Sequence, residues 1–170
     1  MTQCAFFGAL LGLCGWISIP LGDVAFTLQT FGLFLTLLLL EGKWGTAAVT
    51  VYLVLGAAGL PVFSGFRGGL GVLLGATGGY IDGFLLAALG YWLICTLFRS
   101  RPWARTLGCL AGLLLCYSAG TAWFCLAYAG NGGLSLGAVV LKCVLPYVIP
   151  DLAKLYLAQL LAKRLRPFVY

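Results

Sequence analysis

The sequence predicts an all-α integral membrane protein, with residues 1–170 forming one transmembrane domain. The expected architecture is a bundle of six transmembrane helices with a Gly-rich loop between helices 3 and 4. The chain is 62% hydrophobic and 8% charged, and its mean hydropathy of +1.08 lies outside the range of soluble globular domains. A spanning helix needs about 20 residues, so the chain has room for about six with short connections. Glycines are dense at 59–84, between two long apolar segments.

Prolines and a charged turn set the bounds of the first three helices. Proline has no backbone N–H with which to continue a helix, so the first and third helices are expected to end before Pro20 and Pro61. Residues 20–29 are expected to form a loop, and the turn from Glu41 to Lys43 separates the second helix from the third. These helices are expected at residues 4–19, 26–40 and 44–60.

The last three helices follow the Gly-rich loop. A basic turn around Arg101 separates the fourth from the fifth, and a turn beginning at Asn131 precedes the sixth. Pro146 and Pro150 are expected to kink or unwind the sixth helix at membrane depth. These helices are expected at residues 77 or 80 to 98, 106–129 and 136–165.

The basic residues predict the orientation of the bundle in the cell membrane. Lys and Arg collect on the cytoplasmic side of a membrane protein, so both termini are expected in the cytoplasm. The loops at 20–29, 61–77 and 129–136 then share the outer face and roof a pocket that opens to the medium. With six spans, only Arg67 falls on the outer side, and the inner side has Lys43, Arg99, Arg101, Arg105, Lys163, Arg164 and Arg166.

Several classes of function are disfavoured. The net charge of +6 comes from residues at segment ends rather than on one solvated face, so membrane lipid and not nucleic acid is the expected surrounding. Seven cysteines without a CxxC pair are interpreted as small buried hydrophobes, and the chain has no histidine for a triad or a metal. Lys43 is followed by Trp44, so no phosphate-binding G-x-x-x-x-G-K-[ST] loop is present. We expect no cofactor, no metal and no catalysis by this chain.

Lys142, Asp151 and Lys154 put charge deep within a predicted span, where a charge is costly enough to indicate function. Asp151 and Lys154 are three residues apart and share a helix face, so they either pair for structural reasons alone or serve a ligand beside Pro150. Lys142 lies nearer the outer end and either serves the pocket or extends to the headgroups. Asp82 is favoured near a helix N-terminus by the helix dipole.

The predicted outer face supplies further polar candidates. Thr27 and Gln29 stand at the start of an apolar run, where they either cap the helix or face a pocket. Arg67 is the lone cation beside the glycine loop and would clamp an anionic group. Gly71, Gly75, Gly79 and Gly83 recur every fourth residue and form a face for either a flat ligand or a neighbouring helix.

Small residues repeat along the first helix. Ala5 and Ala9 lie one turn apart, and Gly8 and Gly12 repeat the spacing beside them. Such faces allow close helix packing in lipid, either with another subunit or inside the bundle.

Four ordered stretches resemble the BioY family, the biotin-binding S components of energy-coupling factor (ECF) vitamin transporters. They are GLPVFSGFRGGLGVLLGATGGY from residue 59, ISIPLGDVAFTLQT at 17–30, VYLVLGAAGLP at 51–61 and PDLAK at 150–154. Together they cover most of the chain in the family's order.

The resemblance implies a high-affinity substrate-capture subunit that performs no chemistry. Its partners would be a transmembrane T component and two ATPase subunits, whose hydrolysis of ATP would deliver biotin captured outside the cell. The docking face for the T component would be Ala5, Gly8, Ala9 and Gly12. The biotin-binding residues implied are Asp151, Lys154, Gln29 and Tyr80, with Thr27 from the same TLQT stretch, while Arg67 is assigned to the biotin carboxylate by charge alone. Phe63 and Phe66 would add aromatic walls.

Other functions remain open at this point. The chain is alternatively an S component for another small vitamin, or a purely structural membrane subunit that packs through its glycine faces. An intramembrane aspartyl enzyme would require Asp82 and Asp151 to meet.

Overall fold

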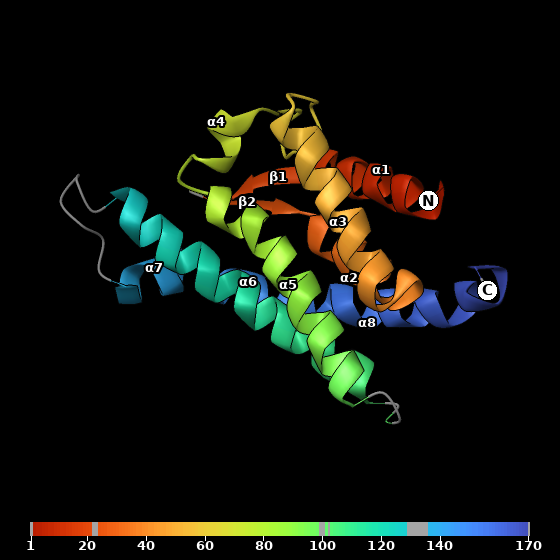
Figure 1. The fold of residues 1–170 in the computed structure, drawn as a ribbon. Coiled ribbons are helices and arrows are strands. Elements are labelled where there is room, and N and C mark those ends of the chain that lie inside the picture. Colours follow the sequence, from red (N-terminus) through yellow and green to blue (C-terminus); the bar gives the residue numbers. More distant parts are fainter. Residues whose placement is uncertain (1, 22–23, 99–100, 102, 129–135, 170) are drawn as a thin grey trace.

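The computed structural model describes residues 2–21, 24–98, 101, 103–128 and 136–169. Arg99 and the turn predicted at 131–133 lie outside these residues. Figure 1 shows an all-α fold to which a two-stranded hairpin is added. The elements are α1 Thr2–Trp16, β1 Ser18–Leu21, β2 Val24–Thr27, α2 Gln29–Leu40, α3 Gly42–Ala57, α4 Leu70–Leu73, α5 Gly78–Leu97, α6 Ala104–Tyr128, α7 Leu136–Cys143 and α8 Leu145–Val169.

The segment after the first helix corrects the sequence prediction. Instead of continuing to residue 19, α1 ends at Trp16, and β1 begins at Ser18 inside the predicted helix. It pairs antiparallel with β2, which lies in the loop expected at 20–29, with Ser18 opposite Thr27. Phe26 belongs to β2, so the second helix begins at Gln29 rather than at residue 26. The ladder gives this backbone the hydrogen bonds that a loop at membrane depth would lack.

The Gly-rich loop contains some regular structure. One turn of helix, α4, lies within it, and Phe63 forms an isolated antiparallel bridge with Arg67. Gly59, Gly65 and Gly69 all have positive φ angles, between 72° and 100°, which residues with a Cβ rarely adopt.

The predicted sixth helix is two helices. It breaks at Val144, between α7 and α8, so the expected kink lies just before the prolines. Pro146 stands in the first turn of α8, where its missing N–H has no intrahelical partner in any case. Pro150 lies inside α8, which continues past it to Val169.

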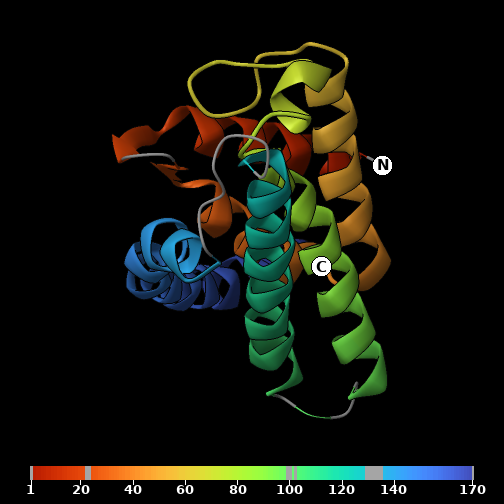
Figure 2. The same ribbon diagram turned by 90° about the vertical axis from the view of Figure 1, so that its left-hand side faces the viewer.

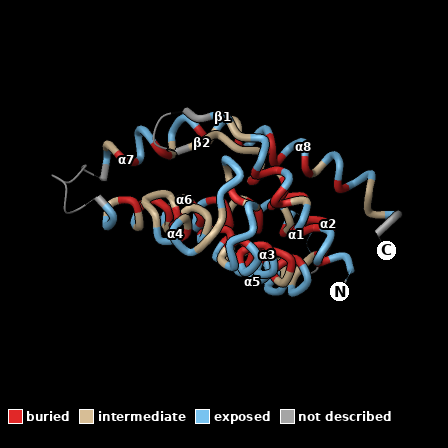
Figure 3. The backbone as a smooth tube through the Cα atoms, turned by 90° about the horizontal axis from the view of Figure 1, so that it is seen from above, coloured by how far each residue is buried: buried red, intermediate tan, exposed pale blue. Residues whose placement is uncertain are grey.

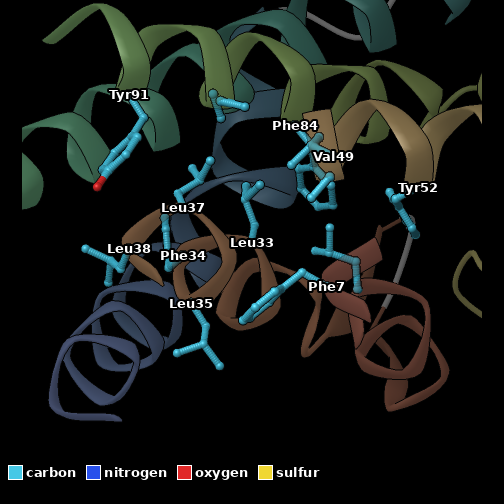
Figure 4. Close-up of a cluster of buried hydrophobic side chains, with 14 of the residues drawn as sticks. Phe7, Leu33, Phe34, Leu35, Leu37, Leu38, Val49, Tyr52, Phe84 and Tyr91 are labelled. Atoms are coloured by element: carbon cyan, nitrogen blue, oxygen red, sulfur yellow. The ribbon is translucent and has the colours of Figure 1, made fainter. Parts of the chain in front are cut away.

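The short helix α2 lies at the centre of the core (Figure 4). All of its residues except Thr30 and Phe31 are buried. Side chains from α1, α3 and α5 surround it in Figure 4, including Phe7, Val49 and Phe84, and α8 packs along it as well. Thr36 is accommodated because its hydroxyl donates to the Gly32 carbonyl oxygen at 2.7 Å.

Glycines allow α5 and α6 to lie against each other, as Figure 2 shows. A Cβ on Gly83 would stand 3.0 Å from the Cα of Cys116, and one on Gly112 would stand 2.8 Å from the Ala87 carbonyl oxygen. Trp123 packs directly over Gly79. Of the predicted glycine face, Gly79 and Gly83 therefore pack against a helix rather than a ligand.

The outer surface is apolar. Figure 3 shows exposed positions along the outward sides of the helices, and many of them are large hydrophobic residues: Phe6, Leu13, Val54, Leu93, Leu97, Leu114, Leu126, Ile149 and Leu157. Within the described residues, Gly78–Leu97 and Ala104–Ala127 are long and apolar enough to cross a membrane, and Thr2–Trp16 and Gln29–Leu40 are apolar but shorter. An apolar exterior of this extent is that of a membrane protein.

Two ion pairs to Glu41 join three parts of the chain at one end of the molecule. Glu41, between α2 and α3, accepts bonds of 2.7 Å from Arg105 at the start of α6 and from Arg166 near the end of α8. Cys4 donates to the Trp44 carbonyl oxygen, which brings the start of α1 to the same end. The start of α1, the turn at Glu41, the start of α6 and the last part of α8 thus share one end of the molecule.

Candidate functional site

A cavity of about 830 Å³, counting the space at its mouth, lies between the hairpin, the Gly-rich loop and the helices α5 to α8. All six residues predicted to bind the substrate line it: Thr27, Gln29, Arg67, Tyr80, Asp151 and Lys154. It is also lined by Ala25, Thr30, Phe63, Ser64, Val72, Thr77, Ile81, Phe84, Cys116, Tyr117, Cys143 and Tyr147.

Asp151 and Lys154 form a buried ion pair in this wall. They are one turn apart on α8, their charged atoms are 2.8 Å apart, and their side chains are only 4% and 8% exposed. Two charges are buried at this depth only when paired and hydrogen-bonded, because desolvation costs several kcal/mol per ion.

The surroundings of Lys154 satisfy its ammonium fully. Its three N–H groups have three acceptors: the Thr27 carbonyl oxygen at 2.6 Å, the Thr30 hydroxyl at 3.1 Å and the Asp151 carboxylate. The ammonium also lies 4.0 Å from the centre of the Phe26 ring, which adds a cation–π contact. Since Thr27 and Phe26 belong to β2, Lys154 fastens the hairpin to α8.

Asp151 is held by donors from three helices. Thr30 on α2 donates to Oδ1 at 2.8 Å, as Lys154 does, and Tyr117 on α6 donates to Oδ2 at 2.6 Å. A carboxylate oxygen accepts two bonds readily, so Oδ2 keeps capacity for one more donor. The group can therefore accept a bond from a polar N–H in the cavity while Lys154 balances its charge.

Thr30 and Tyr117 were not predicted to bind this pair. Thr30 lies in the first turn of α2, next to the predicted Gln29, and its hydroxyl binds the Asp151–Lys154 pair. Tyr117 lies in a long apolar helix, and its hydroxyl is the one signal that could have marked it, since a hydroxyl in such a helix needs a partner.

Gln29 and Thr27 contact each other at the cavity wall. The Thr27 hydroxyl donates to the Gln29 side-chain oxygen at 3.2 Å and accepts from the Gln29 backbone N–H at 3.3 Å. The latter contact resembles the cap that the sequence left open. The Gln29 amide nitrogen donates to the Tyr52 hydroxyl at 2.5 Å, which fixes the buried amide.

Arg67 lies at the exposed side of the cavity, on the bridged turn from Phe63. Its Nε donates to the Ser64 carbonyl oxygen at 3.2 Å, and its backbone oxygen accepts from the Phe63 N–H. In the described part of the chain no carboxylate pairs with it. Its terminal guanidinium nitrogens are thus free of ion pairs at a site where an anion would be held.

Of the aromatic residues predicted to line the cavity, Tyr80 and Phe63 do so and Phe66 does not. Tyr80 lines the cavity, with its hydroxyl 3.4 Å from that of Thr121, and Phe63 is fully buried against the edge of Tyr52. Phe66 is 64% exposed, stacks on Trp16 and does not line the cavity, which corrects its assignment. Trp16 also donates to the Pro61 carbonyl oxygen, so the end of α1 braces this loop.

The remaining charged candidates lie elsewhere. Lys142 on α7 and Asp82 on α5 are exposed, and neither lines the cavity. Asp82 and Asp151 are therefore not brought together, and an aspartyl pair is not formed.

The small residues of α1 lie on two faces. Ala5 and Ala9 are exposed, whereas Gly8 packs against α3 at Ala48 and Gly12 packs against Val62. The structure thus leaves the alanines accessible to another subunit and uses the glycines for internal packing.

Comparison with known proteins shows what the chain is similar to. The model of the BioY family matches residues 1–170. The "Biotin transporter BioY" of Thermotoga maritima is 43% identical over 169 residues, 98% of this chain and 95% of that protein. The "Probable biotin transporter BioY" of Pyrococcus horikoshii is 39% identical over 166 residues, with 98% and 95% covered. These relatives are named as transporters and not as enzymes.

A solved structure has the same fold. The crystal structure of the S-component for biotin from an ECF-type ABC transporter superposes with a TM-score of 0.83 at 27% identity, covering 98% of this chain and 89% of that one. Since the family model spans the whole chain and relatives match it nearly end to end, the chain belongs to the BioY family.

Proposed function

We propose that this protein is the biotin-binding S component of an ECF transporter, which captures biotin from outside the cell. The observation that carries the proposal is the buried Asp151–Lys154 pair in the cavity wall. The family relationship supports biotin as the substrate, and the cavity supplies the groups that this molecule requires.

Biotin has two ureido N–H donors, a ureido carbonyl, an apolar ring and chain, and a terminal carboxylate. Asp151 Oδ2 accepts from a ureido N–H, while Tyr117 and Lys154 hold the carboxylate in place. Phe63, Phe84 and Tyr147 line the space for the apolar part. Arg67 binds the terminal carboxylate at the exposed side.

The order of the helices supports an arrangement in which the chain crosses the membrane six times. Six spans are formed by α1, α2, α3, α5, α6 and the broken pair α7 and α8, with both termini in the cytoplasm. The Glu41 cluster marks the inner end, and Arg67 and the hairpin mark the outer end. The cavity then opens to the medium.

Energy comes from partner subunits. A T component and two ATPase subunits complete the transporter, and the exposed alanine face of α1 at Ala5 and Ala9 docks the T component. The adjacent Gly8 and Gly12 keep α1 close to α3 and to Val62 so that this face is presented.

The test is biotin binding to the purified chain in detergent, measured by calorimetry and by the ligand-induced rise in melting temperature. One biotin should bind per chain, and stability should rise by mass action. Asp151→Asn should weaken binding about 100-fold, because a bond to a charged acceptor in a buried site contributes about 1.5–3 kcal/mol.

The matched control is Asp82→Asn, which makes the same change on an exposed carboxylate outside the cavity. It should bind biotin like the wild type. Wild-type affinity in a folded Asp151→Asn protein would refute the assigned site. Binding of a different small vitamin, with none of biotin, would keep the S-component fold and withdraw the substrate.

A further inference from the structure

A second pocket lies at the opposite end of the molecule from Arg67, beside the Glu41 ion pairs. Its volume is about 570 Å³ counting the open space at its mouth, and α2, α6 and α8 contribute its walls. It is lined by Leu38, Arg105, Thr106, Gln159, Ala162, Lys163 and Arg166. None of these residues lines the biotin cavity, so the pocket needs an explanation of its own.

The pocket has an excess of positive charge. Arg105 and Arg166 both bind Glu41 Oε1, and Arg166 Nη2 also donates to the Leu38 carbonyl oxygen at 3.0 Å. One carboxylate thus faces two guanidinium groups, and Lys163 is exposed with no ion-pair partner among the described residues. The three cations and one anion leave a local charge of about +2, which attracts an anion.

Neutral polar groups complete the lining. Gln159 on α8 donates to the Thr106 hydroxyl on α6 at 3.0 Å. The Thr106 O–H and the second N–H of the Gln159 amide are left as donors. Two fixed neutral donors beside three cationic groups match the several oxygens of a phosphate.

The surroundings of the pocket favour the phosphate of a lipid over a free phosphate ion. Exposed leucines follow the polar lining on each helix, Leu107 after Thr106 and Leu160 after Gln159. Trp103, close in sequence to Arg105, is 47% exposed and lies 5.2 Å from Phe98 between ring centres, as aromatic side chains do at a membrane surface. A headgroup in the pocket would have its acyl chains beside apolar helix surface.

We propose that this pocket binds the phosphate headgroup of an anionic phospholipid and so ties α2, α6 and α8 together at the inner membrane surface. The site does not depend on biotin, so it stands or falls separately from the transport function. Basic pockets between helices on the cytoplasmic side recognise acidic lipids by this chemistry.

The test is native mass spectrometry of the whole chain from mixed micelles of phosphatidylglycerol and phosphatidylcholine. The wild type should retain one phosphatidylglycerol in preference to phosphatidylcholine. Lys163→Gln should lower this preference about fivefold, the effect of one cation near an acidic lipid. Since Lys163 has no ion pair within the described residues, the variant is expected to fold, as its biotin affinity would verify.

Lys43→Gln is the matched control, with the same change in charge at the same end but outside the pocket. It should keep the preference. An equal loss in both variants would reduce the effect to general surface charge and overturn the proposal, as would no loss in Lys163→Gln.

Two further arms identify the source of the phosphate. Inorganic phosphate should raise the melting temperature of the delipidated chain far less than phosphatidylglycerol, and an equal effect would overturn the lipid assignment. Impaired assembly of Lys163→Gln with the ATPase module, at unchanged lipid preference, would assign the pocket to an acidic partner segment and refute the proposal.

Discussion

At the scale of single residues, the site depends on the hydrogen bonds that the buried Asp151 and Lys154 make. Lys154 donates its three N–H groups to acceptors in the protein, while Asp151 Oδ2 can accept one more hydrogen bond. The carboxylate is therefore the member of the pair that can meet a ligand. The lysine pairs with this carboxylate and holds the hairpin.

Lys154→Met is expected to destabilise the protein by about 3–5 kcal/mol, because it leaves a buried carboxylate without its cation. The double variant Lys154→Met with Asp151→Asn should recover much of this loss, since no unpaired charge remains. Thermal unfolding in detergent without biotin measures both. Equal instability of the single and double variants would contradict the pairing argument.

Arg67→Gln is expected to weaken biotin binding about tenfold, because it removes a cation from the proposed position of the terminal carboxylate. The methyl ester of biotin lacks that charge, so its affinity should be nearly equal for the variant and the wild type. Titration calorimetry with both ligands separates the two cases. A similar loss for both would place Arg67 in a structural role.

At the scale of elements, the apolar runs predicted the helices well, with bounds moved by a few residues. The hairpin could not be predicted, because its two strands have only four residues each and Pro20 was interpreted as a helix end. The break at Val144 was predicted a few residues too late. Pro146 is tolerated in the first turn of a helix, so α8 begins at Leu145, just before this proline.

The binding site was predictable only in part, because charged residues stand out in an apolar sequence and hydroxyl groups do not. Asp151 and Lys154 stand out because charges within a predicted span are costly, and Arg67 stands out as the lone cation beside the glycine loop. Thr30 and Tyr117 do not, because hydroxyls are common in spanning helices and only the meeting of α2, α6 and α8 makes these two converge on one carboxylate.

Gly112→Ala is expected to destabilise the α5–α6 packing by about 1–3 kcal/mol, because the new Cβ would stand 2.8 Å from the Ala87 carbonyl oxygen, a backbone atom. Gly137→Ala on α7 is the control, since nothing lies within 4 Å of its Cβ, and its stability should rise slightly. Melting temperatures compare them. A tolerated Gly112→Ala would mean that the two helices separate easily.

At the scale of the whole molecule, two opposite ends have different chemistry. One end carries the Glu41 ion pairs and the basic residues around them, and the other carries the hairpin, the Gly-rich loop and the mouth of the cavity. Between them the surface is apolar on all the long helices. The molecule is thus built along one axis, with the mouth of the cavity at one end and the Glu41 ion pairs at the other.

Ser64→Cys tests this axis in intact cells. Ser64 lines the cavity beside Arg67, so a membrane-impermeant maleimide added outside should label the new thiol, and biotin should slow the labelling. The wild type, with its seven cysteines, gives the background. Labelling that requires broken cells would reverse the proposed orientation.

The bond from Lys154 to the hairpin ends on a main-chain oxygen, that of Thr27. Every amino acid offers such an oxygen, so replacing side chains in the hairpin leaves this anchor intact. Adding or deleting one residue there would instead shift the oxygen away from the ammonium and turn the alternating side chains to the other face. This main-chain anchor should therefore tolerate a change of side chain at residue 27 and be lost when the length of the hairpin changes.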